Sequence, residues 1–414
     1  MAYIYKAAVI GGGTMGGGIA QVVSFSGLPV VIKDINQDAV DKGIQAAREV
    51  YESRVKKGKM TQNEMDQKMA LISGTTSYDG FDDVDIVIEA VSERMDIKKA
   101  VFAELDKVCP DTCIFASNTS ALSISELGAA TKRPDKVIGM HFFNPAPVMK
   151  LVEIIPGLET SEDTINDVMQ FTTELRKTPI RVEECAGFLV NRLLMPFFNE
   201  AVYAAQEGAA SLEEIDAAVT GFGMPMGSFF LADMLGIDIA REVQHILYEE
   251  YGPRMAPAVL IEKMFQAKRF GRKSGVGFYD HGQGPDAAEF VAKAIDEVQA
   301  ETGIRGTSFS FERLILPMIN EAAYAVQEKV ASPNDVDLAM IMGSGMKKGD
   351  TYIGPLQLAD EMGLDVVLAK MEELHKELGV ERFRPAPLLK RKVKAGHLGK
   401  KTGRGFKEYS LETV

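Results

Sequence analysis

Cysteines and long hydrophobic runs are both scarce in this sequence. The 414 residues include three cysteines, and a small, odd number is typical of reduced thiols in a cytosolic compartment. No uncharged apolar stretch reaches the roughly 18 residues that cross a bilayer. Because an apolar strand pattern starts almost at the first residue, we expect neither a signal peptide nor a transit peptide. These absences predict a cytoplasmic protein that does not enter a membrane.

Positive charge is also in deficit. The chain has 59 acidic and 46 basic residues, so its formal net charge is -13. We therefore expect neither nucleic acid nor a membrane surface as a partner, although local basic patches can still attract an anionic cofactor. Cys109 and Cys113 flank Pro110, and no second pair of metal ligands follows them. We therefore expect no metal site.

The most informative stretch is a glycine-rich turn near the start of the chain. A short apolar run at residues 7–10 predicts a buried parallel strand, and helical periodicity follows over residues 15–25. Between them, Gly11, Gly13 and Gly16 have the spacing of a dinucleotide-binding fingerprint. Its glycines permit a tight turn, a close approach of backbone to pyrophosphate, and close packing of helix on strand. The phosphates would bind at the free N–H groups of the new helix.

An aspartate in the next strand predicts which dinucleotide is bound. A second apolar run, residues 28–32, is followed by Asp34, which lies 18 residues beyond Gly16. An acidic side chain there accepts hydrogen bonds from both adenosine ribose hydroxyls and repels a 2′-phosphate. The pattern therefore predicts NAD rather than NADP, bound to an α/β Rossmann-type doubly wound sheet. The alternative is a glycine turn followed by an ordinary strand-end aspartate.

Two helical patterns follow this strand. Residues 38–57 have helical periodicity and lead into a lysine-rich turn at residues 56–59. Thr61 and Glu64 then have the spacing of a capping box, which predicts a second helix over residues 62–71. A lysine cluster of this kind is typical of a solvated helix end, and the functional alternative is attraction of a substrate that carries phosphates.

Polar side chains follow two further strand patterns. Residues 84–89 predict a buried strand, with Glu93 beyond its end and Lys98 in the next helix. Residues 113–116 predict another strand, and the polar residues 117–120 follow it. Ligands of open parallel sheets lie beyond the carboxyl ends of strands, so these side chains are predicted to face the cofactor. The alternatives are a weak surface ion pair and a helix N-cap cluster.

A histidine and a glutamate form the candidate catalytic pair. Residues 137–140 predict a strand that ends at His141, and extended structure resumes at residues 150–155 after a proline-rich turn. Two strands joined in this way can put His141 beside Glu153, the arrangement of a general base and the carboxylate that fixes its tautomer. Oxidising an alcohol by hydride loss requires a proton acceptor. A lone histidine at a strand end is more often structural, but this one accompanies a cofactor motif and a polar cluster.

Five motifs follow one another along the chain. They are Gly11-Gly-Gly-Thr-Met-Gly16, Glu89-Ala-Val-Ser-Glu93, Ser117-Asn-Thr-Ser120, His141-Phe-Phe-Asn-Pro145 and Gly187-Phe-Leu-Val-Asn-Arg192. Together they resemble the NAD-dependent L-3-hydroxyacyl-CoA dehydrogenases of fatty-acid β-oxidation and butanoate metabolism, over the whole chain. The resemblance implies an enzyme that interconverts L-3-hydroxyacyl-CoA and 3-oxoacyl-CoA with NAD.

The resemblance also implies roles for individual residues. His141 resembles the base and Glu153 its partner, while Ser120 and Asn191 would hold the hydroxyl and thioester side of the substrate. The residues implied to bind NAD are Gly11, Gly13, Thr14, Met15, Gly16, Asp34, Glu93, Lys98 and Asn118. The helical hairpin with Lys56, Lys57 and Lys59 corresponds to the place where the family receives coenzyme A.

The second half of the chain repeats itself. Residues 192–201 match residues 313–322 at an offset of 121, and residues 271–278 match residues 399–406. Between these two matches, residues 231–233 match residues 358–360 at an offset of 127, which indicates that about six residues were inserted into the second copy before residue 358. We therefore predict an NAD-binding Rossmann domain with a helical-hairpin insertion at residues 1–184, a first helical domain at residues 185–302, and a second, degenerate copy at residues 303–414.

The two copies differ at a site position. Asn191 corresponds to Glu312 of the second copy, so we expect one catalytic centre per chain, formed by the Rossmann domain with the first copy. Family members with one helical domain usually dimerise through it. The copies are therefore expected to pack as a pseudo-dimer about an approximate twofold axis, in a chain that is a monomer. The chain resembles the dehydrogenase half of bacterial multifunctional β-oxidation subunits without the hydratase domain, so we expect no hydratase or isomerase activity.

Two other functions are consistent with the same fold. One is an NAD-dependent dehydrogenase of a hydroxy acid that carries no coenzyme A. The other is a non-catalytic dinucleotide-binding protein, which the intact set of Ser120, His141, Glu153 and Asn191 disfavours. Dependence of binding on coenzyme A separates the first alternative from the acyl-CoA dehydrogenase.

Overall fold

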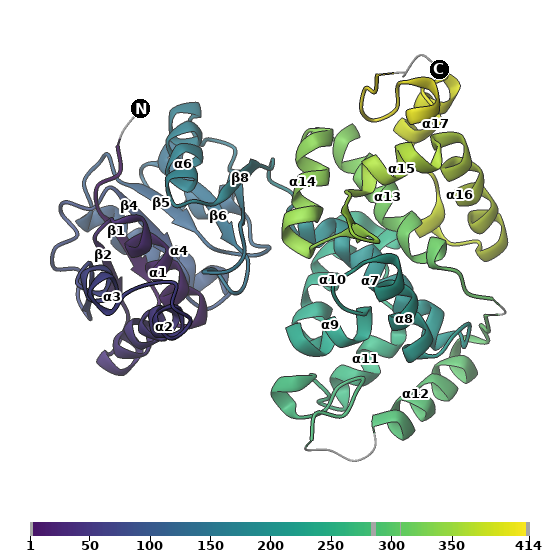
Figure 1. Ribbon diagram of the computed structural model, residues 1–414, viewed down its shortest axis with the longest axis horizontal. Coiled ribbons are helices and arrows are strands. Elements are labelled where there is room, and N and C mark those ends of the chain that lie inside the picture. Colours follow the sequence, from purple (N-terminus) through teal and green to yellow (C-terminus); the bar gives the residue numbers. More distant parts are fainter. Residues whose placement is uncertain (1–2, 283–286, 307, 411–414) are drawn as a thin grey trace. The chain divides into compact units, whose positions relative to one another are not determined.

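The chain divides into two compact units. A computed structural model describes residues 3–282, 287–306 and 308–410, and its contacts separate Met1–Phe188 from Leu189–Val414 (Figure 1). The first unit contains the strands of the sheet and the second is almost entirely helical. The motif at residues 187–192 lies across this division.

The first unit is built on an eight-stranded sheet with the order β3-β2-β1-β4-β5-β6-β7-β8. Its strands are β1 (Ala7–Ile10), β2 (Val30–Lys33), β3 (Ile72–Thr75), β4 (Ile86–Glu89), β5 (Ile114–Ser117), β6 (Val137–Phe142), β7 (Leu151–Pro156) and β8 (Thr178–Arg181). Neighbouring strands are parallel except for β6 and β7, which are antiparallel. The predicted Rossmann-type α/β sheet is confirmed.

Helices cover this sheet. They are α1 (Thr14–Ser26), α2 (Gln37–Lys56), α3 (Gln62–Met69), α4 (Met95–Val108), α5 (Ile124–Gly128) and α6 (Glu162–Glu174), with a 3₁₀ turn at Pro134–Lys136. The predicted helical hairpin is present as α2 and α3, and Thr61 and Glu64 form the expected capping box. Helix α3 ends at Met69 instead of residue 71, because Ile72 already begins β3.

Apolar side chains on both faces of the central strands form the core of this unit. Strands β1, β4, β5 and β6 are buried along their whole length, as expected of parallel strands covered on two sides. The parallel strands β1, β4, β5 and β6 end at one edge of the sheet, and their register pairs Ile10 with Glu89 and Glu89 with Ser117. This edge carries most of the candidate site.

The second unit contains the two predicted helical copies. The first consists of α7 (Val190–Gln206), α8 (Leu212–Phe222), α9 (Ser228–Leu235), α10 (Ile237–Tyr251), α11 (Val259–Gln266) and the linking α12 (Ala287–Thr302), with 3₁₀ turns at Gly252–Met255 and Arg272–Ser274. The second consists of α13 (Phe311–Gln327), α14 (Pro333–Ser344), α15 (Pro355–Met362), α16 (Leu364–Leu378) and α17 (Pro387–Lys394), with 3₁₀ turns at Glu381–Phe383 and Lys400–Thr402. The inserted residues form a small ribbon, β9 (Lys347–Lys348) and β10 (Thr351–Tyr352).

The repeated glycine-rich segments have a structural function in both copies. The Asp233 carboxylate accepts hydrogen bonds of 2.9 Å from the backbone N–H groups of Phe278 and Tyr279. Asp360 accepts the equivalent bonds, also of 2.9 Å, from Phe406 and Lys407. Each buried aspartate therefore closes a loop whose donors would otherwise lack partners.

The two copies pack on each other through α7 and α13, as predicted, and these helices lie together in Figure 1. Buried ion pairs cross this contact in both directions. Arg192 of α7 pairs with Glu321 of α13 at 2.7 Å, and Arg313 of α13 pairs with Glu200 of α7 at 2.5 Å. Since Arg313 and Glu321 are the repeat equivalents of Arg192 and Glu200, this reciprocity is that of an approximate twofold axis.

Candidate active site

The glycine turn has the backbone geometry that the fingerprint requires. Gly11 has φ +106°, which side chains rarely tolerate, and a Cβ atom there would lie 2.6 Å from the carbonyl oxygen of Ala90. A Cβ at Gly16 would lie 1.8 Å from the carbonyl oxygen of Gly11, so helix α1 can approach β1 only with glycine at this position. A Cβ atom at Gly13 would meet nothing within 4 Å, and the residue is exposed. The turn is therefore open on the side of Gly13.

Helix α1 begins directly after the glycine turn. Thr14 and Met15 are its first residues, and no described side chain caps the N-terminal N–H groups. Such groups, at the positive end of the helix dipole, bind phosphate well. Asp34 lies just beyond β2 and accepts hydrogen bonds of 2.6 Å from the backbone N–H groups of Gly12 and Ile35. Asp34 thus ties the glycine turn to the end of the neighbouring strand.

A buried carboxylate that the sequence analysis did not select lies at the centre of this edge. Glu89, the last residue of β4, is fully buried, and its carboxylate accepts from Lys98 Nζ at 2.8 Å and 3.1 Å. Ser117 Oγ donates to it at 2.6 Å and the backbone N–H of Val91 at 2.7 Å. A glutamate that ends an apolar strand is the available sequence signal, because a buried carboxylate needs such partners.

Glu93 extends the same network toward the surface. Its carboxylate lies 3.2 Å from Lys98 Nζ and accepts from Thr119 Oγ1 at 2.6 Å and from the Ser120 N–H and Oγ at 2.7 Å and 3.1 Å. Burial opposes the ionised form, but Lys98 and the hydroxyl and N–H donors outweigh it, so the pKa of Glu93 lies below its usual value. Lys98 is buried, so the alternative of a surface ion pair is wrong.

Replacing Glu93 by glutamine should lower the melting temperature most at neutral pH. A carboxyl whose pKa is lower in the folded protein stabilises the fold above its unfolded pKa, and this contribution is lost as the pH falls through the folded pKa. The difference from the wild type should therefore be large near pH 7 and shrink below about pH 4. Thermal unfolding over this range measures it, with exposed Glu159→Gln as the control. A difference of the same size at every pH would contradict an ionised Glu93.

His141 and Glu153 are brought together as predicted. They face each other across β6 and β7, with His141 Nδ1 2.7 Å from Glu153 Oε2. Glu153 is fully buried and His141 is 7% exposed. The rings of Phe143 and Phe188 lie 4.6 Å and 5.8 Å from the imidazole and hold its plane. The pair therefore has the geometry of an imidazole oriented by a carboxylate.

Asn118 connects the two parts of the site within the first unit. Its Oδ1 accepts a 2.8 Å hydrogen bond from the backbone N–H of Phe142, next to His141. The alternative that residues 117–120 cap the following helix is wrong, because Ser123 caps α5. Asn191, the remaining predicted site residue, is the second residue of α7 in the other unit and is partly exposed.

A cavity of about 520 Å³ lies beside the lysine-rich hairpin. Lys57 and Lys59 line it together with Ser53 of α2, Thr14 of α1 and residues 144–148 of the loop after β6. Lys56, the last residue of α2, is exposed and lies outside the lining. Two polar lining residues, Ser53 and Asn144, had no role assigned from the sequence. Ser53 belongs to none of the motifs, and Asn144 lies within the motif at residues 141–145. Both reach the cavity only because the hairpin and the loop come together.

Among the residues that the structure describes, no group of three or more histidine, cysteine, aspartate or glutamate side chains is arranged to hold a metal ion. Likewise, within the described ranges, every helix is too short or too polar to cross a membrane.

A doubly wound sheet with this glycine turn and a histidine–carboxylate pair defines a Rossmann-type dehydrogenase. Two family profiles cover most of the chain. The NAD binding domain of 3-hydroxyacyl-CoA dehydrogenase matches residues 6–185. The C-terminal domain of 3-hydroxyacyl-CoA dehydrogenase matches residues 187–281 and again residues 309–409. The chain therefore belongs to the 3-hydroxyacyl-CoA dehydrogenase family.

Relatives extend over nearly the whole chain. The fatty acid oxidation complex subunit alpha of Idiomarina loihiensis is 37% identical over 398 residues, which cover 95% of this chain and 55% of that protein. The peroxisomal fatty acid beta-oxidation multifunctional protein MFP2 of Arabidopsis thaliana is 35% identical over 407 residues, with the same 95% and 55% coverage. The chain thus spans about half the length of these curated relatives.

Solved structures agree with this assignment. The 3-hydroxybutyryl-CoA dehydrogenase of Escherichia coli K12 superposes with a TM-score of 0.85 at 30% identity, covering 95% of this chain and 100% of that one. The (S)-3-hydroxybutyryl-CoA dehydrogenase of Ralstonia eutropha has a TM-score of 0.66 at 43% identity and covers 68% of this chain. The predictions of the family, of an NAD-dependent dehydrogenase and of NAD as its cofactor are confirmed.

Proposed function

We propose that the protein interconverts L-3-hydroxyacyl-CoA and 3-oxoacyl-CoA by hydride transfer with NAD. The observation that carries this proposal is the His141–Glu153 pair, at 2.7 Å, on the sheet that bears the dinucleotide turn. NAD, when bound, supplies the hydride acceptor or donor. The residues of the chain must then move the hydroxyl proton and hold the substrate next to NAD in the orientation that hydride transfer requires.

His141 is the proposed general base. A carboxylate at Nδ1 favours the tautomer with the proton on that nitrogen, which directs the lone pair of Nε2 away from Glu153. Nε2 then accepts the proton of the substrate hydroxyl as the hydride leaves. Glu153 stabilises the imidazolium that forms, and in the reverse direction His141 returns the proton to the ketone oxygen. Ser120 and Asn191 are proposed to bind the substrate oxygens.

The polar edge of the sheet is the proposed cofactor site. Gly11, Gly13, Thr14, Met15 and Gly16 would hold the pyrophosphate through backbone N–H groups. Glu93, Lys98 and Asn118 would lie at the nicotinamide end. Glu93 and Lys98 share one hydrogen-bonded network with Ser120, so the cofactor and substrate residues are oriented together.

Coenzyme A is proposed to occupy the cavity beside the helical hairpin. Lys57 and Lys59 face its space and can attract the phosphates, while Ser53 offers a hydroxyl. Lys56 would contribute at longer range. A volume of about 520 Å³ lies within the range of about 300–1,000 Å³ that suits a small organic ligand.

Turnover with acetoacetyl-CoA and NADH tests this function. We expect oxidation of NADH that depends on the coenzyme A part of the substrate. Turnover of free acetoacetate at a similar rate would instead indicate a dehydrogenase of a hydroxy acid without coenzyme A. Binding of NADH without any turnover of either compound would indicate a non-catalytic dinucleotide-binding protein.

Replacing Asp34 by asparagine should weaken NAD binding and relax the rejection of NADP. The amide oxygen can still accept the N–H of Gly12, so the turn keeps its anchor, but the negative charge that repels a 2′-phosphate is lost. The ratio of kcat/KM for NAD to that for NADP measures the change, with exposed Asp38→Asn as the control. Unchanged constants for both cofactors would mean that the adenosine ribose binds elsewhere.

We further propose a cytoplasmic monomer of three domains, at residues 1–184, 185–302 and 303–414. The packing of the second copy on the first supports the monomer. A tethered copy covers the face that a second chain would otherwise cover, without the entropy cost of association. Sedimentation of the whole chain tests the monomer, and a concentration-dependent dimer would contradict it.

A further inference from the structure

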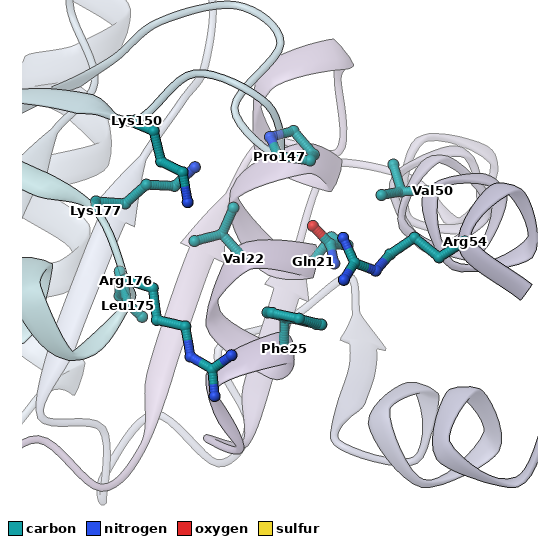
Figure 2. A pocket seen from close by; sticks show the side chains of 10 residues that line it. All are labelled: Gln21, Val22, Phe25, Val50, Arg54, Pro147, Lys150, Leu175, Arg176 and Lys177. Carbon is teal, nitrogen blue, oxygen red and sulfur yellow. The ribbon is translucent and has the colours of Figure 1, made fainter. Parts of the chain in front are cut away.

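A second cavity in the first unit has no assigned role. It measures about 260 Å³ and lies between α1, the C-terminal part of α2, the loop before β7 and the turn between α6 and β8. Four of its lining residues are basic: Arg54, Lys150, Arg176 and Lys177. Figure 2 shows Arg54 extending from one side, and the other three from the opposite side, around Gln21 and Phe25.

All the charged side chains that line this cavity are positive. No carboxylate is among its lining residues, and none of the four cations forms an ion pair within the described part of the chain. This is unusual in a protein whose formal net charge is -13. Like charges that converge repel each other, and the repulsion is relieved when an anion binds between them.

The two arginines are held in place by one aromatic ring. The guanidinium carbons of Arg54 and Arg176 lie 4.6 Å and 5.3 Å from the centroid of the Phe25 ring. Arg54 Nε is buried and has no hydrogen-bond partner among the described residues. Buried polar atoms of this kind normally have a partner, so a donor is available for a ligand.

Lys177 is built into the wall of the cavity. Its Nζ donates to the carbonyl oxygens of Ala146 at 2.5 Å and Met149 at 2.7 Å, which accounts for two of the three N–H groups of an ammonium. Burial and the nearby Lys150 lower the pKa of Lys177 to about 8. The environment thus disfavours the positive charge of Lys177, and an anion beside it would stabilise that charge.

We propose that this cavity is a binding site for a phosphoryl group. Guanidinium groups match phosphate oxygens in pairs, and ammonium groups add point charges. At about 260 Å³ the cavity is smaller than the pockets of about 300–1,000 Å³ that hold drug-sized ligands, so it suits a compact anion or one anionic group.

This phosphoryl group has two candidate sources. Val50, Arg54 and Pro147 line both this cavity and the neighbouring cavity proposed for coenzyme A, so a phosphate of that coenzyme is one source. A free phosphorylated compound is the other. Only the first source rests on the proposed function, because binding of an inorganic anion requires neither NAD nor turnover.

Calorimetric titration of the whole chain with inorganic pyrophosphate tests the site. Arg176→Gln and Lys150→Gln should each weaken binding about tenfold or more, since a hydrogen bond to a charged group is lost. Lys132→Gln removes the same charge at an exposed position and should leave the affinity unchanged. Unaltered circular dichroism shows that the variants are folded. Absence of pyrophosphate binding, or equal loss in all three variants, would overturn the proposal.

Competition identifies the source once pyrophosphate binding is shown. If coenzyme A supplies the phosphoryl group, coenzyme A should displace pyrophosphate, and comparison with dephospho-coenzyme A shows whether its 3′-phosphate is responsible. If the ligand is a free compound, saturating coenzyme A should leave pyrophosphate affinity unchanged. Both results support the site and assign its ligand. Failure of acetoacetyl-CoA turnover alone would reject the proposed function and leave the pyrophosphate result intact.

Discussion

Replacing His141 by alanine should lower turnover by about 10²–10⁴-fold, the usual contribution of a positioned general base. The imidazole is held by Glu153 at 2.7 Å and by two phenylalanine rings, so its loss removes the proton acceptor without removing a contact of the glycine turn. NADH affinity should therefore stay nearly unchanged. Steady-state turnover with acetoacetyl-CoA and fluorescence titration with NADH measure the two effects.

Two further variants sharpen this test. Glu153→Gln keeps the shape of the buried side chain but removes its charge, so turnover should fall less than in His141→Ala. His245→Ala removes a partly exposed histidine of α10 and should leave turnover unchanged. If His141→Ala turned over at close to the wild-type rate, another group would have to be the base.

Replacing Arg192 or Arg313 by methionine should lower the free energy of unfolding by about 3 kcal/mol, the lower end of the cost of breaking a buried ion pair. Arg192 is fully buried, as is Glu200, the partner of Arg313. Each variant leaves a buried carboxylate with fewer donors, although Arg254 still reaches Glu321 and Arg382 still reaches Glu200. These remaining arginines are the reason for expecting the lower end of the range.

The reciprocal geometry makes this prediction specific. Because Arg192 and Arg313 are equivalent in the two copies, the two variants should have similar effects. Lys370→Met breaks the exposed pair with Glu312 and should cost less than about 1 kcal/mol. Chemical denaturation followed by circular dichroism measures all three. A cost for Arg192→Met no larger than that of the Lys370 control would show that the ion pairs between the copies do not stabilise their packing.

Local patterns in the sequence were sufficient to predict much of the fold and part of the candidate site. The glycine spacing around Gly11 and Gly16 identifies the dinucleotide turn, because steric exclusion of a Cβ atom is a property of neighbouring backbone. The capping box at Thr61 and the buried strands are local in the same sense. The repeat could be found by comparing the chain with itself. His141 and Glu153 could be paired because they lie on two strands that follow each other in the chain and are joined by one short turn.

Tertiary structure decided features whose determinants lie far apart in the chain. Strands β3 and β8 were not predicted, because edge strands bury few side chains, and β8 even contains Pro179. The network around Glu89 joins three consecutive elements of the fold, and no spacing in the sequence marks it.

Tertiary structure also decided the cavities and the contact between the two helical copies. Arg54 and Lys177 are far apart in sequence, and only the packing of α1, α2 and the turn before β8 brings their charges to one space. Arg192 and Glu321 could be recognised as repeated residues, but not as partners. Their pairing depends on how two helical copies dock, and docking is determined by the complementary shape of whole buried faces rather than by any local pattern.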